Sequence, residues 1–150
     1  MTKQTIIILI IVCLLLLLQL LPVTRSNPPV AAEIQAPADV QTFLQRACYD
    51  CHSNQTKWPW YSYVAPVSWF IIHDVEEGRE HLNFSEWESY PESKQHNTME
   101  DILDEVTAGD MPLWEYRILH PEAKLENTEL ELLKQWINSI LIINKTDQGQ

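Results

Sequence analysis

Residues 38–52 read ADVQTFLQRACYDCH, and the interpretation of the whole chain starts from this stretch. Its apolar residues recur at the three- and four-residue spacing of a helix; they are Val40, Phe43, Leu44, Ala47 and Cys48. Because Pro37 suits the start of a helix, the pattern predicts a short helix over about 38–49. This helix ends at the last five residues of the stretch, 48–52.

Those five residues, Cys48-Tyr49-Asp50-Cys51-His52, match the C-x-x-C-H signature of c-type haem attachment. Two thiols can form thioethers with the two vinyl groups of one haem, and the neighbouring imidazole of His52 can become the proximal iron ligand. We therefore expect one haem c, covalent through Cys48 and Cys51, with His52 on the iron. Three alternatives stay open: a thioredoxin-like pair, which needs a βαβ context; a zinc site, which needs four ligands; and a strained disulfide.

The sixth iron ligand is expected to be Met111, which stands just before Pro112 in an irregular stretch. A thioether ligand stabilises ferrous iron and raises the reduction potential. Met99 is the other methionine of the body and can equally be a core residue. An open sixth position is a further alternative, as is a second histidine; the remaining histidines are His73, His81, His96 and His120.

A loop dense in aromatic residues, 53–66, follows the signature. We assign Trp58, Trp60 and Tyr61 to the haem pocket, because aromatic rings cover the apolar faces of a porphyrin well. Ordinary core packing is the alternative for each ring. Further aromatic residues fit either role, namely Trp69, Trp114, Tyr116 and Trp136.

The N-terminal segment, 1–25, differs in composition from the rest. Residues 6–18 are unbroken apolar residues, and Lys3 supplies a positive flank. The run predicts one N-terminal transmembrane helix that anchors the protein to the inner membrane, with the body on the periplasmic side; a cleaved signal segment, with secretion to the periplasm, is the alternative. Cys13 lies inside this run and is expected to be a small apolar residue there.

The remainder predicts a single all-α domain, with no alternating strand pattern and no internal repeat. We expect a small cytochrome c-like helical fold with long aromatic-rich loops. Its predicted parts are a linker over 26–37, the haem-binding domain over 38–144 and a polar tail over 145–150. Further helices are expected at 67–80, from Ser85 to Pro91, from Thr98 to Gly109, and at 129–143.

The formal net charge is −11, and only two of the ten basic residues, Lys3 and Arg25, precede residue 26, whereas all 21 acidic residues follow it. An acidic body repels nucleic acid and anionic lipid, so neither is an expected partner. It suits redox partner proteins with basic surfaces, although a charged, soluble surface explains it as well.

Three longer segments resemble the haem-binding domain family of bacterial c-type proteins. They read CYDCHSNQTKWPWYSYVAPVSW (48–69), VEEGREHLNFSEW (75–87) and MPLWEYRILHPEAKL (111–125). The resemblance covers roughly 35–140. It implies one covalent haem at Cys48 and Cys51, His52 as proximal ligand and Met111 as distal ligand.

Single-electron transfer outside the cytoplasm is the function that these features favour, since two protein ligands leave the iron only a change of valence. One alternative is a haem-based gas or redox sensor in which an external ligand displaces Met111. Another is a haem peroxidase-like enzyme, which would need a displaceable ligand and distal acid–base residues.

Overall fold

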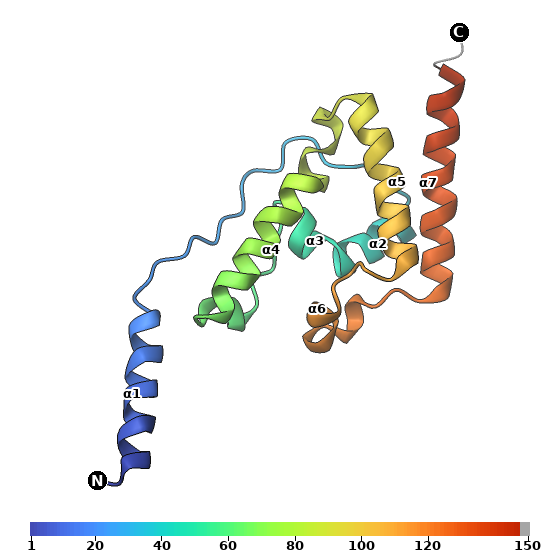
Figure 1. Ribbon diagram of the computed structural model, residues 1–150. Coiled ribbons are helices and arrows are strands. Elements are labelled where there is room, and N and C mark those ends of the chain that lie inside the picture. The colour runs from blue at the N-terminus through green and yellow to red at the C-terminus, as the bar shows by residue number, and fades with distance from the viewer. Residues whose placement is uncertain (148–150) are drawn as a thin grey trace.

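The computed structural model describes residues 1–147, and its regular elements in that range are all helices or 3-10 turns (Figure 1). The helices are α1 (Lys3–Leu18), α2 (Ala38–Ala47), α3 (Tyr49–His52), α4 (Val67–His81), α5 (Glu92–Ala108), α6 (Trp114–Leu119) and α7 (Asn127–Asp147), and the 3-10 turns are η1 (Trp60–Tyr63), η2 (Phe84–Ser89) and η3 (Pro121–Ala123). The predicted all-α class is thus confirmed for the described residues. The predicted polar tail, 145–150, lies partly outside them, at residues 148–150.

The prediction of a transmembrane helix at the N-terminus is wrong. Helix α1 has 16 residues, whereas crossing a bilayer takes about 20. Within the described residues, no helix combines the length and the apolarity needed to span a membrane. The helix ends at Leu18, where the unbroken apolar run also ends, because Gln19 follows with its amide side chain bonded to Ala65 and Pro22 comes soon after.

The apolar core lies where α2, α5, α7 and η2 meet. Helices α5 and α7 pack side by side, as Figure 1 shows, and α2 contacts α7. The largest fully buried side chains come from these elements and include Phe43, Phe84, Met99, Leu133 and Ile137, each at most 1% exposed. Trp136, one of the aromatic residues considered for a haem pocket, belongs to this core instead.

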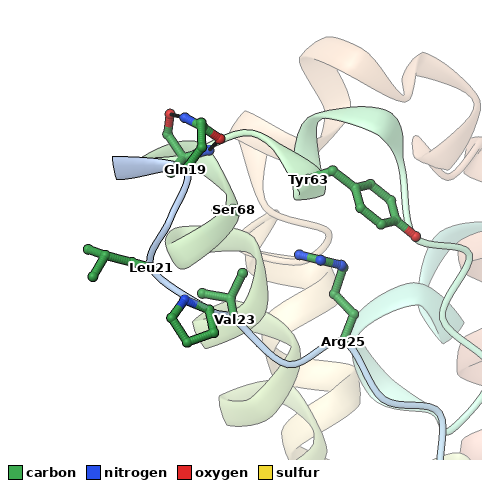
Figure 2. Close-up of a pocket in the computed structure, with 8 residues that line it drawn as sticks. Gln19, Leu21, Val23, Arg25, Tyr63 and Ser68 are labelled. Carbon is green, nitrogen blue, oxygen red and sulfur yellow. Dashed lines mark hydrogen bonds between the residues drawn. The ribbon is translucent and has the colours of Figure 1, made fainter. Parts of the chain in front are cut away.

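The chain between α1 and α2 is hydrogen-bonded to the body at several points. Gln19 bonds both the N–H and the C=O of Ala65, at 3.0 Å each. Arg25 donates to the carbonyl of Ser62 at 3.0 Å and lies over the ring of Tyr63, with its Cζ 4.2 Å from the centroid (Figure 2). These contacts hold residues 19–25 against η1 and the start of α4.

Further along, the same connection reaches the core. The N–H of Ile34 donates to the carbonyl of Phe84 at 2.9 Å, and the Ile34 side chain is 3% exposed. Arg79 of α4 donates to the Ser26 carbonyl at 2.9 Å and to the Ser53 carbonyl at 2.8 Å. The predicted linker over 26–37 therefore contacts the core directly, and Arg79 connects it to the residue that follows His52.

Two helix starts differ from the sequence prediction. Helix α5 begins at Glu92 after Pro91, so Thr98 is a buried residue inside it. The helix expected from Ser85 to Pro91 is the 3-10 turn η2, and it is capped by Asn83, whose side chain accepts from the N–H of Ser85. Gly109 does end α5, because its φ of 84° is a left-handed conformation that glycine adopts easily.

An ion pair between α2 and α7 gives a pH-dependent contribution to stability. Arg46 Nη2 lies 2.7 Å from Glu129 Oε2, and this hydrogen bond holds the pKa of Glu129 below its ordinary value. A lowered pKa in the folded state stabilises the fold above the unfolded value of about 4.3, and the effect is lost as pH falls through the lower folded value.

Glu129→Gln should therefore lower the free energy of unfolding by about 0.5–1 kcal/mol near pH 7. The difference from the unmodified chain should shrink below about pH 4. Urea denaturation of the full chain over this pH range measures it. Glu131→Gln on the same helix is the matched control, because Glu131 pairs with Lys134 at the surface. An equal effect of both substitutions at pH 7 would contradict the assignment.

Candidate haem site

The signature residues form a separate helical turn at the end of α2. The chain bends at Cys48, which has φ −121° and ψ −35°, and α3 then runs over Tyr49–His52. The N–H groups of Cys51 and His52 both bond the carbonyl of Cys48, at 3.2 and 2.9 Å. This turn places both thiols and the imidazole within one compact segment.

His52 is oriented by the C-terminal end of α4. Its Nδ1 lies 2.9 Å from the carbonyl oxygen of Gly78 and 3.2 Å from that of Leu82. Carbonyls only accept, so Nδ1 carries the proton and Nε2 keeps its lone pair. Burial lowers the pKa of His52, while the two carbonyl hydrogen bonds oppose that shift. A neutral, fixed imidazole with an available Nε2 is what a metal ligand requires.

Both cysteines of the turn are unpaired and partly buried. Burial raises the pKa of the Cys48 thiol to about 12, and the neighbouring Cys51 adds to the shift. Burial likewise raises the pKa of the Cys51 thiol to about 12, and the charge of Asp50 adds to the shift. Both side chains are therefore protonated thiols at neutral pH. The donor set of the turn is two thiols and one neutral imidazole.

Gly78 allows α4 to approach α3 closely. A Cβ atom at this position would lie 2.9 Å from the carbonyl oxygen of Cys51 and 3.4 Å from Cys51 Cβ. The first distance is too short for any side chain, and its partner is backbone, which cannot rotate away. The helix expected over 67–80 thus includes Gly78, and α4 continues through this glycine to His81.

Asp50, between the two cysteines, connects the turn to two other segments. Its Oδ1 accepts from the N–H of Lys57 at 2.9 Å, and its Oδ2 accepts from the hydroxyl of Tyr116 at 2.7 Å. Its backbone carbonyl accepts from Thr56 Oγ1 at 2.7 Å. Asp50 thus hydrogen-bonds both the segment after His52 and the segment after Met111.

The two methionines of the body have different surroundings. Met99 is 0% exposed in the core formed with α7. Met111 is partly exposed, after the left-handed Gly109, and its N–H bonds the carbonyl of Glu105 at 3.2 Å. Of the two thioethers, only that of Met111 lies outside the core.

The alternative histidines are engaged with other groups or exposed to solvent. His73 is paired with Glu77, and its side chain is 71% exposed. His96 is paired with Glu100, and His81 is exposed. His120 uses both ring nitrogens, since Nε2 lies 2.7 Å from the Tyr61 hydroxyl and Nδ1 lies 3.1 Å from Glu122 Oε1.

The aromatic residues of the loop after the signature are placed differently from one another. Trp60 is 76% exposed and Trp58 is partly buried. Tyr61 is 7% exposed and bonds His120. The contacts of Tyr61 with His120 and of Tyr116 with Asp50 were not predicted, because they join residues 59 and 66 positions apart.

Comparison with known proteins adds one finding. The family model described as "Haem-binding domain" matches residues 13–139. The chain belongs to this haem-binding domain family. Neither the curated proteins nor the solved structures include a match to the chain.

The cofactor of this haem-binding domain is haem, and the donor set of α3 fits it. The thiols of Cys48 and Cys51 are free, and Nε2 of His52 has no hydrogen-bond partner among the described residues. His52 could ligate the iron through that nitrogen, and the thioether of Met111 could supply a second ligand. A soft thioether with an imidazole is a ligand pair used for haem iron in proteins.

Gly78→Ala should destabilise the protein, although alanine is the better helix former by about 1 kcal/mol. Forcing the new Cβ against the backbone of Cys51 should cost about 1–3 kcal/mol and separate α4 from His52. The measurement is the urea midpoint of the purified full chain. Glu80→Ala, an exposed change on the same helix, should stay within about 0.5 kcal/mol. A Gly78→Ala variant at least as stable as the unmodified chain would show that the close approach is not required.

Proposed function

We propose that this protein is a monohaem c-type cytochrome-like electron carrier that works outside the cytoplasm. Cys48 and Cys51 hold one haem c through thioether bonds, His52 is the proximal iron ligand, and Met111 is the distal ligand. The haem supplies a one-electron change of iron valence. The observation that carries the proposal is the His52 imidazole, fixed through Nδ1 with Nε2 available, in one turn with two unpaired thiols.

The contribution of the protein to this function is to hold the ligands still. Two carbonyls of α4 orient His52, and the close contact at Gly78 keeps α4 against the turn. An electron carrier needs ligands that stay in place in both valence states, so that little rearrangement accompanies transfer. Covalent attachment also prevents haem loss, which supports the proposed location outside the cytoplasm.

Tyr61 and Trp58 are proposed to flank the haem as apolar cover. Both lie in the segment that follows the signature, and both are at least partly buried. Trp60, by contrast, is exposed and is available to a redox partner. Partners with basic surfaces suit the net charge of −11.

A haem-based sensor is the second candidate, and one observation favours it. Helix α6, which follows Met111, has no buried residue. A distal ligand on a weakly packed segment can be displaced by a small molecule such as carbon monoxide. The same optical experiment separates the two functions.

The test uses the full chain, produced in a host that attaches haem c, and records spectra of the oxidised and reduced protein. The proposal predicts a low-spin spectrum with the weak near-infrared sulfur-to-iron band. Met111→Leu should abolish the band and lower the reduction potential, because a thioether favours ferrous iron. Met99→Leu is the control and should keep the band, since a similar volume fills the core.

A high-spin spectrum in the unmodified protein would refute ligation by Met111. A low-spin protein that binds carbon monoxide readily once reduced would favour the sensor function. If the near-infrared band survives in Met111→Leu, a sulfur ligand is present but Met111 is not that ligand.

Charge steering gives an independent prediction. Reduction of this protein by a basic c-type cytochrome should slow steeply as salt rises from about 0.01 to 0.15 M, because the Debye length falls from about 30 to about 8 Å. An acidic cytochrome of similar potential is the control, and its rate should rise slightly with salt. A rate for the basic partner that does not change with salt contradicts the proposed partner class.

A further inference from the structure

Helix α6 follows Met111 closely, yet apolar burial does not hold it in position. None of its residues is buried. Its large apolar side chains are mostly exposed: Trp114 is 62%, Ile118 64% and Leu119 58% exposed. A helix of six residues is also too short to be stable alone. Contacts other than core packing must therefore fix this segment.

Two polar contacts lie on one face of this segment. The Tyr116 hydroxyl donates to Asp50 Oδ2 at 2.7 Å, and His120 Nε2 lies 2.7 Å from the Tyr61 hydroxyl. Tyr116 and His120 are four residues apart, and their rings stack with centroids 4.3 Å apart and planes 12° apart. The stacked rings of Tyr116 and His120 therefore connect the hydrogen bond to Asp50 with the contact to Tyr61, and the four residues form one unit.

The proton positions in this unit follow from chemistry. A carboxylate only accepts, so His120 Nδ1–H donates to Glu122, and Nε2 accepts from Tyr61. Burial raises the pKa of Tyr61. Burial and the hydrogen bond to Asp50 raise the pKa of Tyr116. Both phenols thus remain donors, and the bond from Tyr116 to the Asp50 carboxylate is the charge-assisted one.

The acceptor of that bond is itself fixed. Asp50 lies between the two cysteines of the signature, and its other carboxylate oxygen accepts from the N–H of Lys57 at 2.9 Å. Tyr116 stands five positions after Met111, a reach of at most about 18 Å of extended chain. One hydrogen bond therefore joins the turn that carries Cys48, Cys51 and His52 to the segment that carries Met111.

We propose that Tyr116, through its hydrogen bond to Asp50, is a positioning residue that keeps Met111 over the haem iron. The pair is called the Asp50–Tyr116 latch. With the latch closed, Met111 resists displacement and the protein acts as an electron carrier. With the latch open, α6 has no core packing to retain it, and the sixth position becomes accessible to an external ligand. The inference rests on the proposed function, since it requires Met111 to be a ligand.

The experiment compares five full-chain variants carrying covalent haem: Tyr116→Phe, Asp50→Asn, the double variant, Tyr90→Phe and Met111→Leu. Tyr116→Phe removes only the hydroxyl and keeps the stacked ring. Tyr90→Phe is the matched control, because the Tyr90 hydroxyl accepts one hydrogen bond from the N–H of Asn83 at 2.9 Å, in the core region. The readouts are the near-infrared sulfur-to-iron band and the rate of carbon monoxide binding to the reduced protein.

Carbon monoxide should bind Tyr116→Phe about tenfold faster than the unmodified protein, the factor expected for loss of one hydrogen bond to a charged group. The near-infrared band should weaken in parallel, while Tyr90→Phe should match the unmodified protein. Asp50→Asn should have a smaller effect, because its amide can still hydrogen-bond the Tyr116 hydroxyl but without the charge. The double variant should match Tyr116→Phe, because the two changes act on one shared interaction.

Two outcomes overturn the inference and are distinguishable. If Met111→Leu leaves the band and the carbon monoxide rate unchanged, Met111 is not a ligand and both proposals fail. If Met111→Leu changes both readouts while Tyr116→Phe behaves as Tyr90→Phe does, ligation stands and the latch is refuted. Additive effects of the Tyr116 and Asp50 changes would likewise refute a shared bond.

Discussion

The contact between the His52 imidazole and the end of α4 is the interaction on which the rest of the site depends. Carbonyls at the C-terminal end of a helix carry partial negative charge, and the Gly78 carbonyl here also accepts the N–H of Leu82. Here the carbonyls of Gly78 and Leu82 accept the Nδ1 proton, which fixes both the tautomer and the direction of the ring. The contact is possible only because residue 78 lacks a side chain. A single glycine thus determines how close α4 lies to the turn and how the imidazole is presented.

The molecule combines two kinds of packing. The half formed by α2, α5, α7 and η2 is a conventional apolar core with Phe43, Met99 and Ile137 at its centre. The half that carries the candidate distal ligand is held by polar contacts instead, chiefly Tyr116 with Asp50 and Tyr61 with His120. Polar contacts open at lower free energy than an apolar core does. Under the proposed function, this division would let one fold attach haem firmly at α3 while the sixth ligand stays displaceable.

Local patterns in the sequence predicted much of this structure. The spacing of apolar residues gave α2, α4 and α7 to within a few residues at most ends, and Gly109 ended α5 as expected. The C-x-x-C-H pattern and the longer segments around it indicated haem, in agreement with the family match. Each of these features depends on residues within about one helix length of one another.

The features that the sequence predicted wrongly or missed depend on contacts between distant residues or on competition between local signals. The helix at the N-terminus is too short to span a membrane, because it ends at Leu18 and the next residue, Gln19, bonds Ala65, 46 positions later. Pro91 starts α5 earlier than the Thr98 cap, since a proline suits the beginning of a helix as well as threonine does. The sequence around Gly78 does not mark it as a residue that allows close packing. Likewise, no pattern of neighbouring residues predicts the contact of Tyr116 with Asp50.

The central claim is that Cys48 and Cys51 bind one haem covalently, and mass spectrometry tests it most directly. The full chain, produced in a host that attaches haem c, is extracted with acidified acetone to remove any haem that is not covalently bound, and its intact mass is measured. The account predicts the mass of the polypeptide plus one haem, and the polypeptide mass alone for a Cys48→Ser, Cys51→Ser double variant. A polypeptide mass without haem for the unmodified chain would contradict it.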